Sequence, residues 1–300
     1  MIGALAQAVG GGTADESPFR RNIRLFLSSR LSTISAAVVL GFVVLAVAAP
    51  LFAPHDPSET DLFRRLQPPV WMVDGEWAYV LGCDALGRDI LSRIIYGARI
   101  SIFIGVVVIL LATCIGILAG LAAGYLRGWT DVVISRLVDI LLGFPYLIFA
   151  IALIAMMGPG LQNILLVLVY REWVVPCRLV RGETLAAREV EYVEAARALG
   201  ASRRHIMLRE ILPNILSPVI VVSTIRMAHV IILEASLSFL GLGVQPPTAS
   251  WGSMVADGRS FMLEAWWVST FPGLAILLLV LAINVASQGL RDAFDPKFHD

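Results

Sequence analysis

Ionisable side chains inside otherwise apolar segments are the first residues of this sequence that could do chemistry. Six of them interrupt stretches dominated by Ile, Leu, Val and Ala, namely Asp139, Arg171, Glu172, Arg226, His229 and Glu234. A charged group that faces hydrocarbon costs on the order of several kcal/mol, so we expect each one to face protein or a wet cavity. Two interpretations follow. The groups line a polar path, or they form ion pairs between helices or subunits, and we favour the second.

Four of the six remain candidates for such a lining: Arg171, Glu172, Arg226 and His229. Arg171 and Glu172 lie about ten residues inside the end of their apolar segment, which corresponds to roughly 15 Å along a helix and therefore to the middle of a membrane. Asp139 and Glu234 are the two that we expect to be structural.

A second group of charged residues lies in one block, Arg178 to Pro213. Of 23 Lys/Arg and 23 Asp/Glu residues in the chain, 12 fall between Arg178 and Glu210. The pattern predicts a short helix over residues 189–199 with a C-cap at Gly200, and a second helix that is capped by Ser202 and ends at Pro213. The paired small residues Ala195 and Ala196 would let another surface approach the first helix closely.

Signatures of catalysis are missing from the sequence. The only lysine, Lys297, stands near the C-terminus and cannot belong to a phosphate-binding loop of the Gly-x-x-x-x-Gly-Lys-Ser/Thr type. No His-Glu-x-x-His, Gly-x-Ser-x-Gly or Cys-x-x-Cys pattern occurs. We therefore expect no enzyme activity, no cofactor and no metal on this chain. The cysteines, Cys83, Cys114 and Cys177, are interpreted as small buried hydrophobic residues.

Composition identifies the environment in which these residues work. Of the 300 residues 58% are hydrophobic and only 15% are charged, against about 25% charged in soluble domains. The chain is therefore predicted to be an all-α polytopic membrane protein. The formal net charge is zero, so no nucleic-acid partner is indicated.

Six apolar segments are long enough to cross a bilayer, for which about 20 residues suffice. They cover residues 31–53, 100–125, 132–157, 161–180, 215–240 and 265–290. Residues 1–30 form a polar tail, 54–97 and 241–264 form outer segments, and 291–300 form a C-terminal tail. Glycines 116, 120 and 124 make a stripe of small residues on which another helix can pack closely. Trp251, Trp266 and Trp267 are expected in the membrane-interface belt.

The basic residues set the orientation. Of the Lys and Arg residues, 14 fall in the N-terminal tail, the turn at Arg127, the charged block and the C-terminal tail, and 5 fall in the two outer segments. Because basic residues collect on the cytoplasmic side, both termini and the charged block are predicted to be cytoplasmic.

Within that block, Glu194-Ala195-Ala196, Gly200 and Leu212-Pro213 resemble the EAA loop of bacterial ABC importer permeases. The family pattern has Ile two residues before the Leu-Pro, where this chain has Glu210. The resemblance implies that residues 182–213 carry the coupling helix that docks in a groove on a cytoplasmic ATPase. The docking residues it implies are Tyr192, Glu194, Ala195, Ala196, Leu199 and Gly200.

Three further stretches resemble the C-type subunits (DppC/OppC-like) of the dipeptide/oligopeptide branch of these permeases. They are residues 81–99, with Cys83 where Thr is usual, residues 238–252, and residues 290–296. The resemblance covers about residues 20–298. It implies a first transmembrane helix and outer segment over 31–97, followed over 98–290 by the five-helix core of type I importers (MetI-like), which makes six transmembrane helices in total.

The same resemblance implies partners. They are a second permease subunit in a heterodimer, two cytoplasmic ATPase subunits that hold ATP and Mg, and an extracytoplasmic substrate-binding protein, all at the bacterial inner membrane. Short peptides are the implied cargo, while nickel complexes, glutathione or another small solute stay open. A self-sufficient secondary transporter is the rival class, and it would need an inverted repeat, which the sequence does not show.

Overall fold

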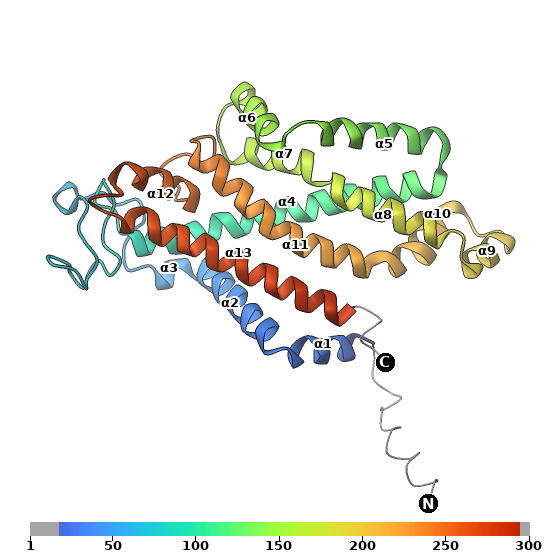
Figure 1. Ribbon diagram of the computed structural model, residues 1–300, viewed down its shortest axis with the longest axis horizontal. Coiled ribbons are helices and arrows are strands. Elements are labelled where there is room, and N and C mark those ends of the chain that lie inside the picture. The colour runs from blue at the N-terminus through green and yellow to red at the C-terminus, as the bar shows by residue number, and fades with distance from the viewer. Residues whose placement is uncertain (1–17, 295–300) are drawn as a thin grey trace, which may run out of the picture.

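The computed structural model describes residues 18–294, and most of this part of the chain is helical (Figure 1). Residues 1–17 of the predicted tail, and Lys297, lie outside the described residues. The helices are α1 (Pro18–Ser28), α2 (Arg30–Val47), α3 (Ala49–Phe52), α4 (Ile90–Leu126), α5 (Gly128–Gly143), α6 (Tyr146–Met157), α7 (Leu161–Glu172), α8 (Val174–Ala187), α9 (Glu191–Ala198), α10 (Arg203–His205), α11 (Leu212–Phe239), α12 (Trp251–Gly258) and α13 (Trp267–Phe294). Short turns of tighter or wider helix cover Leu62–Arg64, Ile206–Ile211 and Arg259–Phe261.

All six predicted membrane segments are helical, but they are not six uninterrupted helices. Four helices of the described part are long and apolar enough to span a membrane: α2, α4, α13 and the continuous stretch Arg203–Phe239 that contains α11. The bent pair α5 and α6 makes a fifth span if it is counted as one. The remaining segment is divided at Trp173 into α7 and α8, of 12 and 14 residues. The all-helical membrane fold is thus confirmed, and the count of six holds for segments and not for straight helices.

The third predicted segment does not run straight. Its two halves, α5 and α6, meet at an angle of 92°. Pro145 is the N-cap of α6, and the residue before it, Phe144, adopts an extended conformation with φ −97° and ψ 134°. The proline ring disfavours helical geometry at the preceding residue, which ends α5 at this point. The predicted segment 132–157 is therefore helical on both sides of a break at Phe144-Pro145.

The helix capped by Ser202 also differs from its prediction, because it does not end at Pro213. Ser202 accepts a hydrogen bond from the His205 amide at 3.3 Å, as expected of an N-cap. The chain then passes through one π-helical turn, Ile206–Ile211, in which the Leu212 amide donates to the Met207 carbonyl, and continues as α11. A proline lacks an amide hydrogen and crowds the carbonyl four residues earlier. The wider π turn accommodates Pro213 without ending the helix.

The glycine stripe on α4 packs against α8, as the spacing predicts. A Cβ atom at Gly116 would lie 2.6 Å from the Pro176 side chain, and a Cβ at Gly120 would lie 2.7 Å from the Cys177 carbonyl. Gly124 meets Thr184 in the same way. Side chains larger than hydrogen would force the two helices apart, so the glycines set how closely α8 lies on α4.

At the outer end, tryptophan side chains form core instead of a membrane-interface belt. Trp251 and Trp267 are buried, and only Trp266 is exposed, so the expected belt is wrong for two of the three. The Trp251 indole donates to the Ile94 carbonyl at 2.9 Å, and that of Trp267 donates to the Cys83 carbonyl at 3.3 Å. Because each indole N–H has a backbone partner, the rings can be fully buried in the cluster that also contains Ile90 and Met254.

The segment before α4 is held by local polar contacts. Asp84 accepts the Arg88 guanidinium at 2.7 Å and Asp89 caps α4 by accepting the Ser92 amide at 2.9 Å. Gly87 has φ +73°, and a Cβ there would collide with the Asp61 backbone. The stretch Gly87-Arg88-Asp89 therefore forms a turn with a local ion pair to Asp84. Cys83 is buried here and Cys177 is buried against α4, whereas Cys114 is exposed, contrary to the expectation.

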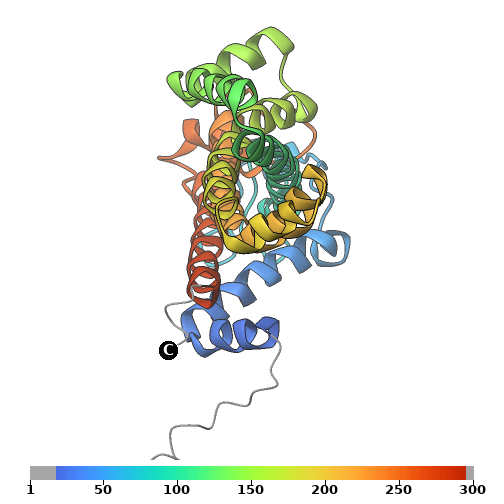
Figure 2. The ribbon, with the colours of Figure 1, turned by 90° about the vertical axis from the view of Figure 1, so that its right-hand side faces the viewer.

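The long helices run side by side along the long axis of the molecule (Figure 1). Seen along that axis, α1 and α2 lie on one side of the core formed by α4, α8, α11 and α13, and α5 and α6 lie on the opposite side (Figure 2). Along this axis, α1, α9 and the last turn of α13 lie toward one end of the molecule, and α3 and α12 lie toward the other (Figure 1).

Candidate functional site

The helix α9 projects at one end of the molecule, beyond the ends of the membrane helices (Figure 1). It comprises Glu191–Ala198, which is shorter than the predicted 189–199 by two residues at the start and one at the end. Glu191 and Glu194 lie in its first turn and Arg197 in its last, so these charges stabilise the helix dipole at both ends. The predicted short helix is therefore present, and its own sequence stabilises it.

Gly200 ends α9 in the manner that the sequence predicts. Its φ is +81°, which a residue with a Cβ adopts only at a cost. The Gly200 amide donates to the Arg197 carbonyl at 3.1 Å and the Ala201 amide donates to the Ala196 carbonyl at 3.0 Å. This pair of bonds is the Schellman arrangement, which turns the chain sharply back toward the membrane helices.

One face of α9 is anchored in the molecule and the other is bare. Val193 is fully buried in a cluster with Ile206 and Ile211, and Ala196 packs against the same cluster. The remaining predicted docking residues are exposed: Tyr192, Glu194, Ala195, Leu199 and Gly200. Leu199 is 88% exposed, an unusual position for an apolar side chain on a polar loop. A face of this kind, rigidly held and partly apolar, is suited to binding another protein.

Polar contacts connect the α9 hairpin, residues 188–211, to the membrane helices. The Arg188 guanidinium donates to the Tyr125 carbonyl at the end of α4, at 3.2 Å, and lies over the Tyr125 ring. The Tyr192 hydroxyl accepts from the Asn214 amide group in the first turn of α11, at 3.3 Å. A displacement of α9 would therefore act directly on α4 and on α11.

A basic pocket lies beside α9, which the sequence does not reveal because its residues come from separate segments. Its volume is about 470 Å³ and its lining includes Arg127, Arg188, Arg197 and Arg203. Arg127 and Arg188 each lie within ion-pair distance of Glu189, at 3.5 Å and 3.2 Å. With one carboxylate among four arginines in this group, the pocket is suited to an acidic group of a partner.

A second cluster lies between membrane helices and brings together three of the four predicted lining residues. The Glu172 side chain, at the end of α7, is 1% exposed. It accepts two hydrogen bonds from Arg226 of α11, from Nε at 2.9 Å and from Nη2 at 2.7 Å. The Nδ1 atom of His229, one turn further along α11, lies 3.6 Å from the same carboxylate. A bidentate pair of this kind ties α7 to α11.

The fourth residue, Arg171, is oriented differently. Within the described residues, its Nε atom is buried without a hydrogen-bond partner, and so is the hydroxyl of Tyr146 on α6. Tyr146 lies within electrostatic range of Arg171, Glu172 and Arg226, which adds a residue that the charge pattern alone could not identify. His229 has a more exposed side chain, 44%, than Glu172 or Arg226.

The two residues expected to be structural differ from each other. Glu234 is completely buried and accepts from Ser238 at 2.7 Å and from Ser101 of α4 at 3.3 Å, so it links α11 to α4. Asp139 instead lies on an exposed part of α5.

Family models match two parts of the chain. Residues 116–300 match the binding-protein-dependent transport system inner membrane component family, and residues 17–69 match the N-terminal transmembrane domain of oligopeptide transport permease C.

Curated relatives match along almost the whole chain. The di/tripeptide transport system permease protein DppC of Pseudomonas aeruginosa (strain UCBPP-PA14) is 42% identical over 94% of this chain and 93% of its own length. The dipeptide transport system permease protein DppC of Haemophilus influenzae is 40% identical over 95% and 96%. The glutathione transport system permease protein GsiD of Pectobacterium atrosepticum is 41% identical over 94% and 92%.

Among solved structures, the fold is similar to a chain of the MetNI methionine ABC transporter in an inward-facing conformation. The TM-score is 0.54 at 19% identity, over 68% of this chain and 97% of that chain. A second crystal form gives a TM-score of 0.56. Taken with the extra helix α2 and the hairpin around α9, these matches establish that the chain belongs to the family of inner membrane components of binding-protein-dependent transport systems, in the branch that carries the N-terminal domain of oligopeptide transport permease C.

Proposed function

We propose that this chain is one of two permease subunits of a peptide-importing ABC transporter and that α9 is the element through which a separate ATPase drives it. The observation that carries the proposal is the construction of α9. Its Val193 face is buried against the membrane helices, while Glu194, Ala195 and Leu199 are presented outward.

The proposal includes the partners that the family resemblance implies. A second permease would complete the translocation path, two cytoplasmic ATPase subunits would supply ATP and Mg, and an extracytoplasmic binding protein would deliver cargo. The four-arginine pocket beside α9 supports an acidic groove on the ATPase as the docking surface. In this proposal α9, α1 and the end of α13 face the cytoplasm at the inner membrane, in agreement with the distribution of basic residues.

The path for cargo would run past the cluster of Arg171, Glu172, Arg226 and His229. The Glu172–Arg226 pair supports a structural role for those two residues, whereas the half-exposed His229 and the unsatisfied Arg171 remain the lining candidates. Both have the polar groups that a zwitterionic peptide needs on its way through the membrane.

The docking test compares two charge reversals in the purified importer complex. Glu194→Arg together with Gly200→Trp alters the exposed face of α9, and Glu264→Arg reverses an equally exposed carboxylate near the opposite end. Truncating a hot-spot contact costs about 2 kcal/mol or more, so we expect ATPase affinity to fall roughly 30-fold or further in the α9 variant. The control should keep its ATPase. Continued ATPase retention and transport by the α9 variant would show that docking occurs elsewhere.

Short peptides are the proposed cargo because most of the relatives described above are named for peptide transport. The glutathione permease is equally similar, so overall identity does not separate the two substrates. The experiment is uptake of a labelled dipeptide and of labelled glutathione by vesicles that contain the whole importer. We expect ATP-dependent dipeptide uptake, and glutathione uptake alone would replace peptides as cargo. Accumulation by vesicles that contain this chain alone would support a secondary transporter instead.

A further inference from the structure

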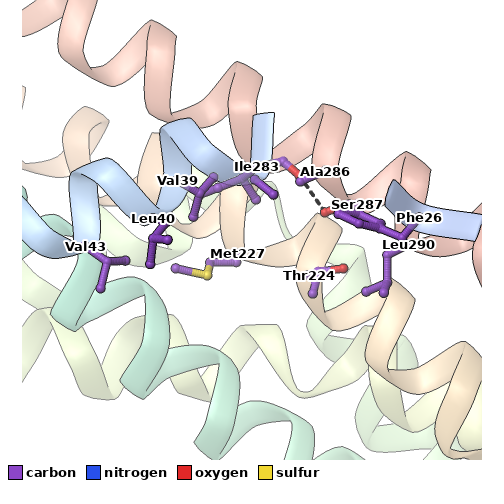
Figure 3. A pocket seen from close by; sticks show the side chains of 11 residues that line it. Phe26, Val39, Leu40, Val43, Thr224, Met227, Ile283, Ala286, Ser287 and Leu290 are labelled. Atoms are coloured by element: carbon purple, nitrogen blue, oxygen red, sulfur yellow. Dashed lines mark hydrogen bonds between the residues drawn. The ribbon is translucent and has the colours of Figure 1, made fainter. Parts of the chain in front are cut away.

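The N-terminal helix α2 leaves a groove between itself and the core. The groove has a volume of about 360 Å³ and lies between α2, α11 and α13, with Phe26 of α1 at one end (Figure 3). Ala36, Val39 and Leu40 form its α2 wall, and Met227 and Ile283 lie opposite. Leu40 is 62% exposed, so the groove opens on the outer surface of the helix bundle.

The lining offers nothing to a polar ligand. Its two hydroxyl groups both donate back to their own helices. Ser287 donates to the Ile283 carbonyl at 2.7 Å (Figure 3), and Thr224 donates to the Val221 carbonyl at 2.8 Å. The other lining residues carry only apolar side chains. Hydrocarbon is therefore the chemistry that fits.

The size of the groove distinguishes between two apolar occupants, a transmembrane helix and a lipid acyl chain. A transmembrane helix with its side chains is about 10 Å across, which is too wide for a groove of this volume between three helices. A single acyl chain is narrow enough to lie along it. At the α1 end of the groove, α1 and α2 pack tightly on α13. A Cβ on Gly289 of α13 would collide with Ser32 and would lie 3.3 Å from the Phe26 ring.

Positive charge surrounds that end of the groove. Leu290 lines the groove and the exposed Arg291 follows it, while the exposed Arg30 begins α2. α1 adds Arg21 and Arg24, and the acidic residues of the same two chain ends are Asp15, Glu16, Asp292, Asp295 and Asp300. Ile23 and Leu27 of α1 are apolar and exposed, 43% and 56%, as in a helix that lies in the membrane interface.

We propose that this groove binds an anionic phospholipid, with one acyl chain between α2, α11 and α13 and the phosphate against the arginines of α1, α2 and α13. The lipid would fill the gap between the N-terminal domain and the core. Its place in the cytoplasmic leaflet rests on the orientation in the proposed function, whereas its binding does not.

The test measures lipid retention by native mass spectrometry of the purified importer, without ATP or substrate. The probes are phosphatidylglycerol and phosphatidylcholine with identical oleoyl chains. Near-surface basic residues each contribute about 1 kcal/mol toward anionic lipid, so Arg30 and Arg291 together should make phosphatidylglycerol preferred roughly 30-fold. Ala36→Phe fills the groove from α2 and should abolish retention of that lipid. Ala37→Phe places the same ring one residue away on the exposed face and should retain it.

Three further variants make the result decisive. Ala286→Phe fills the groove from α13, in case Ala36→Phe displaces α2. The double change Arg30→Gln and Arg291→Gln should remove the headgroup preference, whereas Arg99→Gln, an exposed arginine on α4, should keep it.

Equal retention in the groove-filling variants, or no headgroup preference in the unaltered protein, would overturn the proposal. So would efficient cross-linking of Leu40→Cys to the second permease, because a protein segment would then occupy the groove. A failure of ATPase docking at α9 would leave lipid retention unchanged, so the two proposals fail separately.

Discussion

At the residue scale, burial decides how the polar groups of this protein behave. Cys83 illustrates this in the outer segment. The thiol is completely buried, and burial, with smaller contributions from Asp89 and Asp84, raises its pKa to about 12. The thiolate is the reactive form of cysteine, so Cys83 should be inert at neutral pH even though it lies outside the membrane.

This inertness can be measured with a maleimide at pH 8. In the folded protein Cys83 should remain unlabelled, and it should react only after denaturation. Replacing Leu86 by cysteine in the same turn provides the control, because Leu86 is 44% exposed and its replacement should label quickly. Rapid labelling of Cys83 itself would show that residues 82–89 open in the native protein.

The Glu172–Arg226 pair gives a second prediction at this scale. Arg226→Met leaves a buried carboxylate without its bidentate partner, which costs roughly 3 kcal/mol or more. The double variant Glu172→Gln, Arg226→Met should recover much of the loss, because no buried charge is then unpaired. Thermal unfolding of the purified complex measures the stability of the single and the double variant, with Arg99→Met as a surface control. A double variant no more stable than the single one would mean that the pair is not the main contact of either residue.

At the element scale, the close contact of α4 and α8 positions the hairpin that carries α9. α8 leads directly into that hairpin, and three glycines of α4 bring the two helices together. Arg188 and Tyr192 then connect the hairpin to the ends of α4 and α11. α9 therefore moves with these helices and not as a loose loop.

Two glycine-to-alanine substitutions separate the effect of helix packing on stability from the effect of helix propensity. Gly120→Ala places a Cβ 2.7 Å from both the Cys177 carbonyl and the Val180 side chain, and overpacking of this kind costs about 1–3 kcal/mol. Gly41→Ala on α2 meets nothing within 4 Å and should be neutral or stabilising by up to about 1 kcal/mol. The melting temperature of the complex should therefore fall in Gly120→Ala and stay unchanged or rise in Gly41→Ala, and equal shifts would contradict the tight α4–α8 contact.

At the scale of the whole molecule, the two ends differ in construction. The end with α12 is closed by buried tryptophans and the Asp84–Arg88 ion pair, while the opposite end presents α9 and a basic pocket. Between them, large apolar side chains such as Leu111, Leu118 and Ile140 are exposed on the bundle surface, where lipid or the second subunit would cover them.

This asymmetry predicts an orientation that can be tested in sealed vesicles. With the native cysteines replaced, Leu199→Cys and Leu263→Cys each place a thiol at a highly exposed position, at 88% and 101%. A membrane-impermeant thiol reagent should label the Leu199 position only in inside-out vesicles and the Leu263 position only in right-side-out vesicles. The reverse pattern would place α9 outside the cell and contradict the proposed coupling.

Much of this protein is determined by sequence-local chemistry. Long apolar runs predict membrane helices, the glycine spacing on α4 predicts a close helix contact, and Gly200 after Glu191–Ala198 predicts where the chain turns, because each depends on residues within a few positions of one another. Two prolines depend on their wider surroundings: Pro145 bends its segment by 92°, whereas Pro213 continues its helix because a π turn accommodates it.

Contacts between distant segments were decided only in the tertiary structure. The sequence favours ion pairs among the intramembrane charges but does not say that Glu172 pairs with Arg226. It also does not indicate that four arginines from separate segments meet beside α9, or that Trp251 donates to Ile94. The free energy of a buried charge or indole depends on which partner reaches it in three dimensions. Residue type and spacing show which buried groups need a hydrogen-bond or ion-pair partner, and only the packing of the helices decides which group becomes that partner.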